Sequence, residues 1–178
     1  EMRKLTQVYL EFDRDSLPFT DPRRPAFLVA DHVLGGHFYS RLYVALRHEA
    51  GDTYGAGTSD SGDVVPNVYA ASTFTRAENA GPIEAKLRGA MNVFQEKGIT
   101  EDERAGAISY LRGNRAFDRQ SAGQIFRRFL MERRLSLPPG FFDDQIERAS
   151  TLSAGEINAF IREFYEPGQF TIVRAVPE

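Results

Sequence analysis

The sequence contains no cysteine and no tryptophan, and lysine accounts for only three of its 22 basic residues. Without cysteine there is no disulfide framework, no thiolate zinc site, no iron–sulfur cluster and no cysteine nucleophile. No run approaches the roughly 18–20 apolar residues of a membrane span, and no basic stretch followed by an apolar segment opens the chain. We therefore expect a soluble protein without a signal peptide, in the cytoplasm or the bacterial periplasm. The start at Glu1 rather than methionine fits a chain processed or excised from a longer one.

The 178 residues carry a formal net charge of −3, and 42% of them are apolar. This length predicts one domain, large enough to bury a core without a disulfide or a metal. The slightly acidic balance disfavours a general polyanion binder but is compatible with a local basic patch.

Alternating and apolar runs predict four strands. Residues 6–12 alternate with a period of two, which is typical of a half-buried strand. Residues 53–58 and 64–75 flank a turn-rich stretch and predict a hairpin, with Pro66 at a strand start or on an edge. The nearly continuous apolar run 170–176 predicts a strand that is buried on both sides or lies deep in a sheet, and that pairs near the first.

Helical periodicity covers residues 26–34 and 39–50, and most of the chain between the hairpin and the last strand. Three pairs of residues have the spacing of a capping box, and each precedes an apolar stripe that we expect to face the core. The pairs are Thr100 with Glu103, Ser121 with Gln124, and Ser153 with Glu156. The stripe after the second pair is Ile125, Phe126, Phe129 and Leu130. Separate blocks of strands and helices predict an α+β fold, a mainly antiparallel sheet with helices packed on one face.

Without cysteine, histidine is the remaining characteristic zinc ligand, and the three histidines form no helical zinc signature. His32 and His37 would lie about 140° apart on a helix, and Gly35-Gly36 interrupts that helix. Neither H-E-x-x-H nor H-x-x-E-H occurs, and no G-x-S-x-G supplies a serine nucleophile. The clustered carboxylates stand in helix first turns, where the helix dipole favours them. We therefore expect no metal site and no catalytic residue in this chain.

Residues 112–134 form a basic stretch with a local excess of five positive charges. The arginines are Arg112, Arg115, Arg119, Arg127, Arg128, Arg133 and Arg134, opposed by Asp118 and Glu132. One interpretation is a surface for nucleic acid or an acidic partner. The other, which we favour, is a solvated helical face, because no exposed aromatic residues follow a stacking pattern.

One segment is more specific than these patterns. It reads VLGGHFYSRLYVALR from Val33 to Arg47, followed by HEAGDTYG from His48 to Gly55. Its L-G-G, S-R-L, L-R and G-x-x-Y elements, in this order, resemble the signature of the non-catalytic half-domain of insulinase/pitrilysin-type zinc peptidases. That group includes mitochondrial processing peptidase.

The resemblance extends beyond this segment. Gln7, residues 98–100 and residues 164–167 stand where the family places them, so we interpret 1–178 as a single non-catalytic half-domain. Two positions depart from the pattern: His48 replaces a residue that is often acidic, and Asp52 replaces one that is usually apolar.

The resemblance implies a division of labour between two similar halves that close like a clam shell around a chamber. The catalytic half carries H-x-x-E-H and the zinc, whereas this half needs no cofactor and is expected to be inactive alone. By the match of motifs, Arg47 and Tyr54 are the residues that reach the peptide substrate. A guanidinium can grip peptide carbonyl oxygens with fixed geometry, and a phenol can donate a hydrogen bond to a developing oxyanion.

Other interpretations of these residues remain open. Arg47 could instead pair with Glu49 or a sheet residue, and Tyr54 could be a rim residue without a role. We expect Arg41 to serve helix packing or an ion pair, and Gly35-Gly36 to permit a tight turn between helices.

Two rival functions also remain. The first is a structural scaffold subunit, because the family includes members that have lost peptidase function. The second is a nucleic-acid-binding module that uses residues 112–134, and we rank it last.

Overall fold

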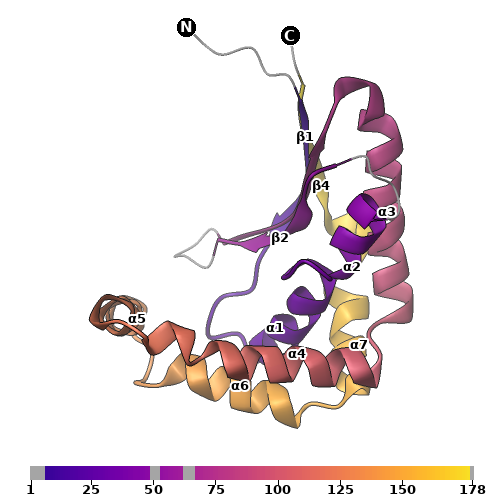
Figure 1. The fold of residues 1–178 in the computed structure, drawn as a ribbon. Coiled ribbons are helices and arrows are strands. Elements are labelled where there is room, and N and C mark those ends of the chain that lie inside the picture. Colours follow the sequence, from indigo (N-terminus) through magenta and orange to yellow (C-terminus); the bar gives the residue numbers. More distant parts are fainter. Residues whose placement is uncertain (1–6, 49–52, 62–66, 177–178) are drawn as a thin grey trace, which may run out of the picture.

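The computed structural model describes residues 7–48, 53–61 and 67–176. These residues form a four-stranded antiparallel sheet with helices against one of its faces (Figure 1). The α+β fold expected from the sequence is therefore confirmed. Along the chain the elements are β1 (Val8–Asp15), α1 (Arg24–Leu34), α2 (Arg41–Tyr43), η1 (Val44–His48), β2 (Ala56–Asp60), β3 (Val68–Thr75), η2 (Ala77–Asn79), α3 (Ala80–Lys97), α4 (Glu101–Asn114), η3 (Phe117–Arg119), α5 (Ala122–Arg134), α6 (Phe141–Thr151), α7 (Ala154–Phe164), η4 (Pro167–Gln169) and β4 (Thr171–Ala175).

The sheet has the strand order β2-β3-β1-β4. The predicted alternation in β1 is confirmed, since Val8, Leu10 and Phe12 are at most 3% exposed whereas Tyr9 is 48% exposed. The hairpin of β2 and β3 is also confirmed. Pro66 lies outside the described residues.

The last strand differs from its prediction. β4 pairs with β1, as expected, but it is an edge strand and four of its five residues are exposed. Val173, for example, is 44% exposed. The prediction of a strand buried on both sides or deep in a sheet is wrong, because β4 is an edge strand with one neighbour and the described helices cover only one face of the sheet.

The core lies between the sheet and three helices, α1, α3 and α7. The stripes predicted on α3 and α7 are buried there: Ile83, Leu87, Met91 and Phe94 on α3, and Ile157, Phe160, Ile161 and Phe164 on α7. Two fully buried tyrosines bring hydroxyls into this core, and the Tyr165 hydroxyl donates a hydrogen bond of 3.3 Å to the Tyr69 hydroxyl. Satisfying such buried polar groups internally avoids a desolvation cost of about 1–3 kcal/mol each.

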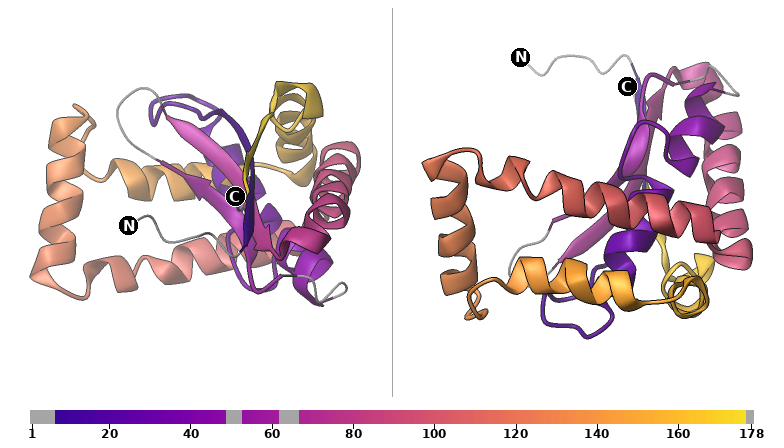
Figure 2. Two further views of the ribbon diagram at one scale, coloured as in Figure 1. Left: turned by 90° about the horizontal axis from the view of Figure 1, so that it is seen from above. Right: turned by 60° about the horizontal axis from the view of Figure 1, so that its bottom comes forward.

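Helices α4, α5 and α6 form an arm that extends from the core. α4 and α6 both pack against α1, and α5 crosses between their far ends (Figure 2). The capping boxes predicted at the starts of α4 and α7 are complete, and Ser121 caps α5 through the Gln124 backbone N–H.

The stripe predicted on α5 does not face the core. Ile125, Phe126, Phe129 and Leu130 are 47–60% exposed, so this part of the prediction is wrong. The reason is that α5 spans the end of the arm, where the described chain offers no further layer to pack against (Figure 2).

Gly98 joins α3 to α4 in a backbone conformation that suits glycine alone. Its φ of 65° and ψ of −156° lie in a region that side chains exclude. A Cβ there would also lie 2.2 Å from Oδ1 of Asn158. That oxygen accepts a hydrogen bond from the Ile99 N–H at 2.7 Å, and Asn158 Nδ2 donates to the Ile99 carbonyl at 3.0 Å.

We expect Gly98→Ala to lower the free energy of unfolding by about 3 kcal/mol, because it combines backbone strain with loss of the Asn158 contacts. The control is Gly89→Ala on α3, where a Cβ meets nothing within 4 Å. That change should raise stability by about 1 kcal/mol through helix propensity. Urea denaturation of both variants tests the difference, and equal midpoints would contradict it.

Candidate functional site

The segment that carries the family motif begins with two close backbone contacts. A Cβ on Gly35 would lie 2.4 Å from Cγ2 and 2.5 Å from the backbone nitrogen of Thr58, and one on Gly36 would lie 2.8 Å from Cα of His32. Gly36 N–H bonds to the carbonyls of Asp31 and His32 at the end of α1. The glycines therefore permit the turn, as expected, and Gly35 also lets α1 touch β2.

Arg41 fixes the start of the following helix. Its Nε and Nη2 donate to the two carboxylate oxygens of Glu103 at 2.8 and 2.7 Å, which confirms the expected ion pair. Burial alone would raise the pKa of Glu103, but the bonds from Arg41 and Thr100 outweigh it and the pKa is lowered. The motif is thereby held to the capping box of α4.

The predicted helix over 39–50 is observed as α2 followed by η1, a π-helix. Single π-turns are rare and are frequently found at functional sites. Residues 49 and 50 lie outside the described part of the chain.

Arg47 lies in η1 with an exposed side chain. Its guanidinium carbon is 5.0 Å from the centroid of the Tyr43 ring, which is 7% exposed and meets Phe38 edge-on. This cation–π contact restrains the side chain and is worth about 0.5–1 kcal/mol. No carboxylate among the described residues pairs with Arg47, so its N–H groups can donate to a ligand. The alternative partner Glu49 lies outside these residues.

Hydrogen bonds on both sides of Tyr54 restrain its backbone, whereas its side chain is exposed to solvent. Thr53 Oγ1 donates to the Phe74 carbonyl at 2.6 Å and accepts from Gly55 N–H at 3.1 Å. Thr73 Oγ1 donates to the Gly55 carbonyl at 3.0 Å. The Tyr54 ring is nevertheless 75% exposed. The neighbouring hydrogen bonds thus fix where the Tyr54 side chain starts, although its ring does not pack in the core.

The neighbours of Tyr54 connect it to the sheet face that the described helices leave uncovered. A Cβ on Gly55 would lie 3.4 Å from the Phe74 ring. Phe74 is opposite Tyr9 in the β1–β3 register and stacks on it, with ring centroids 5.8 Å apart. Tyr9 points away from the core, so Tyr54 stands at the border of the uncovered face.

His32 and His37, which the sequence separates on opposite sides of the helix, are stacked with ring centroids 4.3 Å apart. The Gly35-Gly36 turn folds the chain back, and His37 Nδ1 lies 3.0 Å from the His32 carbonyl. The Tyr110 ring also stacks on His32, with ring centroids 4.4 Å apart. Among the described residues, no three His, Asp or Glu side chains are grouped to hold a metal ion.

Burial, and then repulsion from His37, lowers the pKa of His32 from 6.5 to about 4. A histidine with a lowered folded pKa binds more protons when unfolded, so stability is present above pH 6.5 and is lost as the pH falls towards 4. We expect the His32 ring protons to titrate near pH 4 by NMR. In His32→Gln, the loss of stability between pH 6.5 and 4 should be smaller; an identical pH dependence would contradict the assignment.

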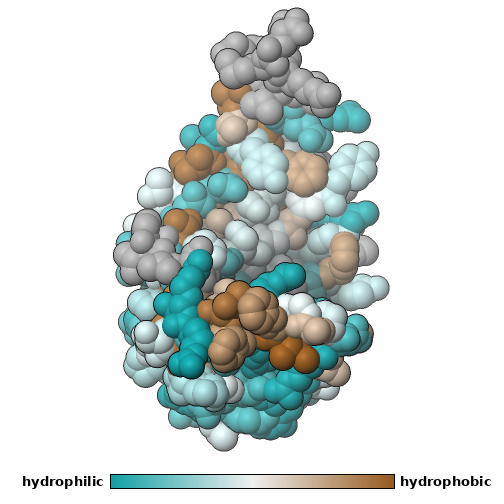
Figure 3. Space-filling view, turned by 90° about the vertical axis from the view of Figure 1, so that its left-hand side faces the viewer, coloured by the Kyte–Doolittle hydropathy of each residue, from teal (hydrophilic) through white to brown (hydrophobic). Residues whose placement is uncertain are grey.

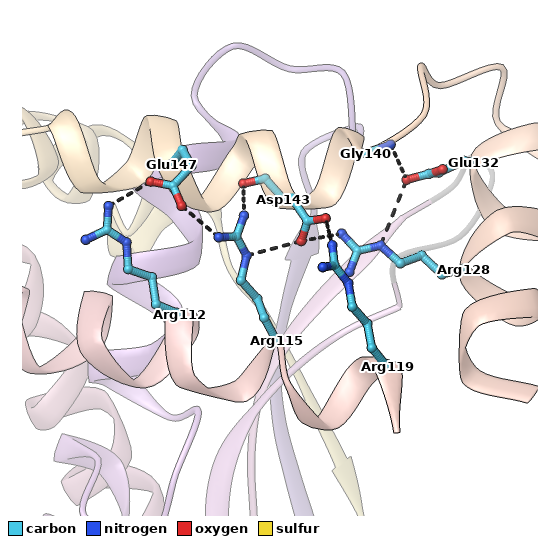
Figure 4. A network of polar contacts seen from close by, with 8 residues as sticks. All are labelled: Arg112, Arg115, Arg119, Arg128, Glu132, Gly140, Asp143 and Glu147. Atoms are coloured by element: carbon cyan, nitrogen blue, oxygen red, sulfur yellow. Dashed lines mark hydrogen bonds and ion pairs between the residues drawn. The ribbon is translucent and has the colours of Figure 1, made fainter. Parts of the chain in front are cut away.

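The arginines of the basic stretch are largely paired with carboxylates of α6 (Figure 4). Asp143 contacts Arg115 at 3.1 Å and Arg128 at 2.8 Å, and it also pairs with Arg119. Glu147 contacts Arg115 and Arg112, each at 2.7 Å.

This pairing changes the interpretation of the basic stretch, residues 112–134. Four of the seven arginines hold the arm together, because α6 brings carboxylates that lie beyond the basic stretch in sequence. The stretch is therefore not a continuous basic surface, and the nucleic-acid interpretation loses its main support. In the sequence, the acidic residues in the first turn of α6 were the signal that could have predicted this pairing.

We expect Asp143→Asn to lower the free energy of unfolding by about 2 kcal/mol, because the half-buried guanidiniums of Arg115 and Arg128 and the exposed one of Arg119 lose their shared anion. The neighbouring Asp144 is exposed in the same helical turn. Asp144→Asn should lose only the helix-dipole contribution, about 0.5 kcal/mol. Denaturant unfolding at low salt separates the two, and equal effects would show that the ion pairs contribute nothing.

No helix in the described part of the chain combines the length and the hydropathy needed to span a bilayer.

Comparison with known proteins identifies relatives. The family model for the peptidase M16 inactive domain matches residues 1–111. The chain is 24% identical over 161 residues to SCO5738, an uncharacterized zinc protease of Streptomyces coelicolor, and the match covers 90% of this chain and 35% of that protein.

Solved structures show the same fold. A peptidase M16 inactive domain from Pseudomonas fluorescens matches 99% of this chain and 42% of its own, with a TM-score of 0.87 and 21% identity. The periplasmic protease PqqL from Escherichia coli matches all of this chain over 20% of its own, with a TM-score of 0.75 and 16% identity. The chain thus spans less than half of these proteins. Because the family model matches more than half of the chain and the fold agrees, this chain belongs to the peptidase M16 inactive domain family.

Proposed function

We propose that residues 1–178 are the non-catalytic, substrate-binding half of an M16 zinc peptidase. This half closes a chamber against a catalytic half and takes part in peptide-bond hydrolysis only when the two are joined. The observation that carries the proposal is the presentation of Arg47 and Tyr54. Each is exposed, has no ion-pair or hydrogen-bond partner within the described residues, and stands on a locally restrained element.

Each residue would act on an extended peptide through its own chemistry. The Arg47 guanidinium donates to peptide carbonyl oxygens with forked geometry. The Tyr54 hydroxyl donates to the oxyanion that develops when the scissile carbonyl is attacked. A phenol and a guanidinium both donate hydrogen bonds through N–H or O–H groups that they already carry, so neither residue needs a proton transfer to bind the peptide.

Zinc belongs to the catalytic half in this proposal. The described residues of this chain offer no grouped metal ligands, and the relative from Streptomyces coelicolor is a zinc protease nearly three times as long as the matched segment. No step assigned to this chain therefore involves the metal. Its residues bind and orient the peptide.

The test uses the joined halves and a quenched-fluorescence peptide substrate. Tyr54→Phe should lower kcat about 100-fold with little change in KM, because it removes one oxyanion donor. Arg47→Ala should raise KM about tenfold, because it removes a contact made in the ground state as well.

Matched controls are Tyr110→Phe on α4 and Arg76→Ala, which change an exposed phenol and an exposed guanidinium elsewhere. Both should retain wild-type kinetics. Wild-type kinetics in the Arg47 and Tyr54 variants as well would reject the role assignment and favour a scaffold.

A further inference from the structure

The apolar side of helix α5 faces solvent instead of the core. Ile125, Phe126, Phe129 and Leu130 form one continuous stripe at helical spacing, and each is about half exposed. These four residues are called the α5 stripe below. Figure 3 shows apolar side chains gathered over this end of the molecule, bordered by hydrophilic ones.

The opposite side of α5 is mostly polar and faces inward. Gln124, Arg127, Arg128 and Met131 line a cavity of about 430 Å³ that α5 shares with α1, α4 and α6. Glu132 is only 8% exposed and accepts a hydrogen bond from Gly140 N–H at 3.1 Å. A helix exposed to water on its outer side normally has the reverse arrangement.

The inverted orientation is fixed by contacts. Arg128 reaches Asp143 on α6 at 2.8 Å, and Glu132 accepts its hydrogen bond from Gly140 before α6, so polar contacts hold the inner side of α5. Turning the stripe inward would place these charged groups in water and break both of these contacts. The fold thus holds the stripe exposed to solvent, and an exposed apolar patch of this kind is typical of a surface that binds a partner.

Charge and position identify the kind of cover. Arg133 lies over the stripe, 5.6 Å from the Phe129 ring, whereas the acidic residue of α5, Glu132, is buried. A positive charge beside the stripe favours an occupant that carries carboxylates beside its apolar surface over a second copy of this chain. The stripe and the uncovered sheet face lie on the same side of the molecule, the side shown in Figure 3.

We infer that the α5 stripe is the docking surface for the zinc-binding half. The inference rests on the proposed function, since it takes the occupant to be the catalytic half of the same peptidase. This chain spans 35% of its Streptomyces coelicolor relative and 42% of the Pseudomonas fluorescens protein. The remainder of such proteins supplies a domain large enough to cover the stripe, and a domain docked there also faces the sheet beside Tyr54.

The experiment measures association without substrate. The probe is the H-x-x-E-H half from the same source, produced separately with zinc bound, and the dissociation constant is measured by sedimentation velocity. Phe126→Asp and Leu130→Asp should each weaken the 1:1 complex about 30-fold. Val93→Asp on α3 is the matched control, because Val93 is 45% exposed and gains the same charge. It should bind like wild type.

Charge and exposure provide two further readouts. Arg133→Glu should weaken binding more than Arg76→Glu, and the difference should shrink with salt. In the wild-type complex, hydrogen exchange at the amides of α5 should slow, a result that needs no variant.

Three outcomes would overturn the inference: equal affinity of the stripe variants and Val93→Asp, stripe-dependent self-association of this chain, or stripe-dependent binding to phosphatidylcholine–phosphatidylglycerol vesicles without binding to the zinc half. Arg47→Ala should bind the zinc half like wild type. The docking inference and the proposed substrate roles of Arg47 and Tyr54 can therefore be rejected independently of each other.

Discussion

The apolar residues of β1 lie on one side of the strand only, and the arrangement of the molecule depends on that constraint. Val8, Leu10 and Phe12 face the helices, so the core forms on that side of the sheet. The other side keeps Tyr9 and Phe74, a half-exposed aromatic pair next to the loop of Tyr54. A single alternating strand thus separates the face that packs on the helices from the face on which we propose that a peptide binds. The exposed Tyr54 borders this second face.

The arm follows a different rule, because its charges lie inside and its apolar residues outside. Asp143 gathers three guanidiniums, from the residue that follows α4, from η3 and from α5, and arginine suits this task because its planar fork can serve two acceptors at once. The ion pairs set the orientation of α5 rather than its burial. An apolar surface held open by charge is suited to association, whereas the same residues packed inward would have added only to the core.

Much of the fold could be predicted from periodicity and capping. The boxes at Thr100 and Ser153 mark the starts of α4 and α7, and the alternation of β1 gives its buried face. Periodicity tells which side of an element is apolar but not what covers it, so the predictions failed at the α5 stripe and at β4. The contact of Gly35 with Thr58 and the pairing of Arg115 with Glu147 join residues far apart in sequence, and no local pattern encodes them. The family motif singled out Arg47 and Tyr54, and the structure adds how each is restrained.

The strand order also has a consequence in time. Tyr9 of β1 pairs with Phe74 on one side and with Ala175 on the other, so the two partners leave the ribosome far apart. The 95 residues between β3 and β4 take about 5–20 s to synthesise. Throughout that interval one edge of β1 has no strand beside it, and an unpaired edge can recruit another chain. The nascent protein therefore depends on its helices, and on the chaperones around it, to shield a central strand until the last strand arrives.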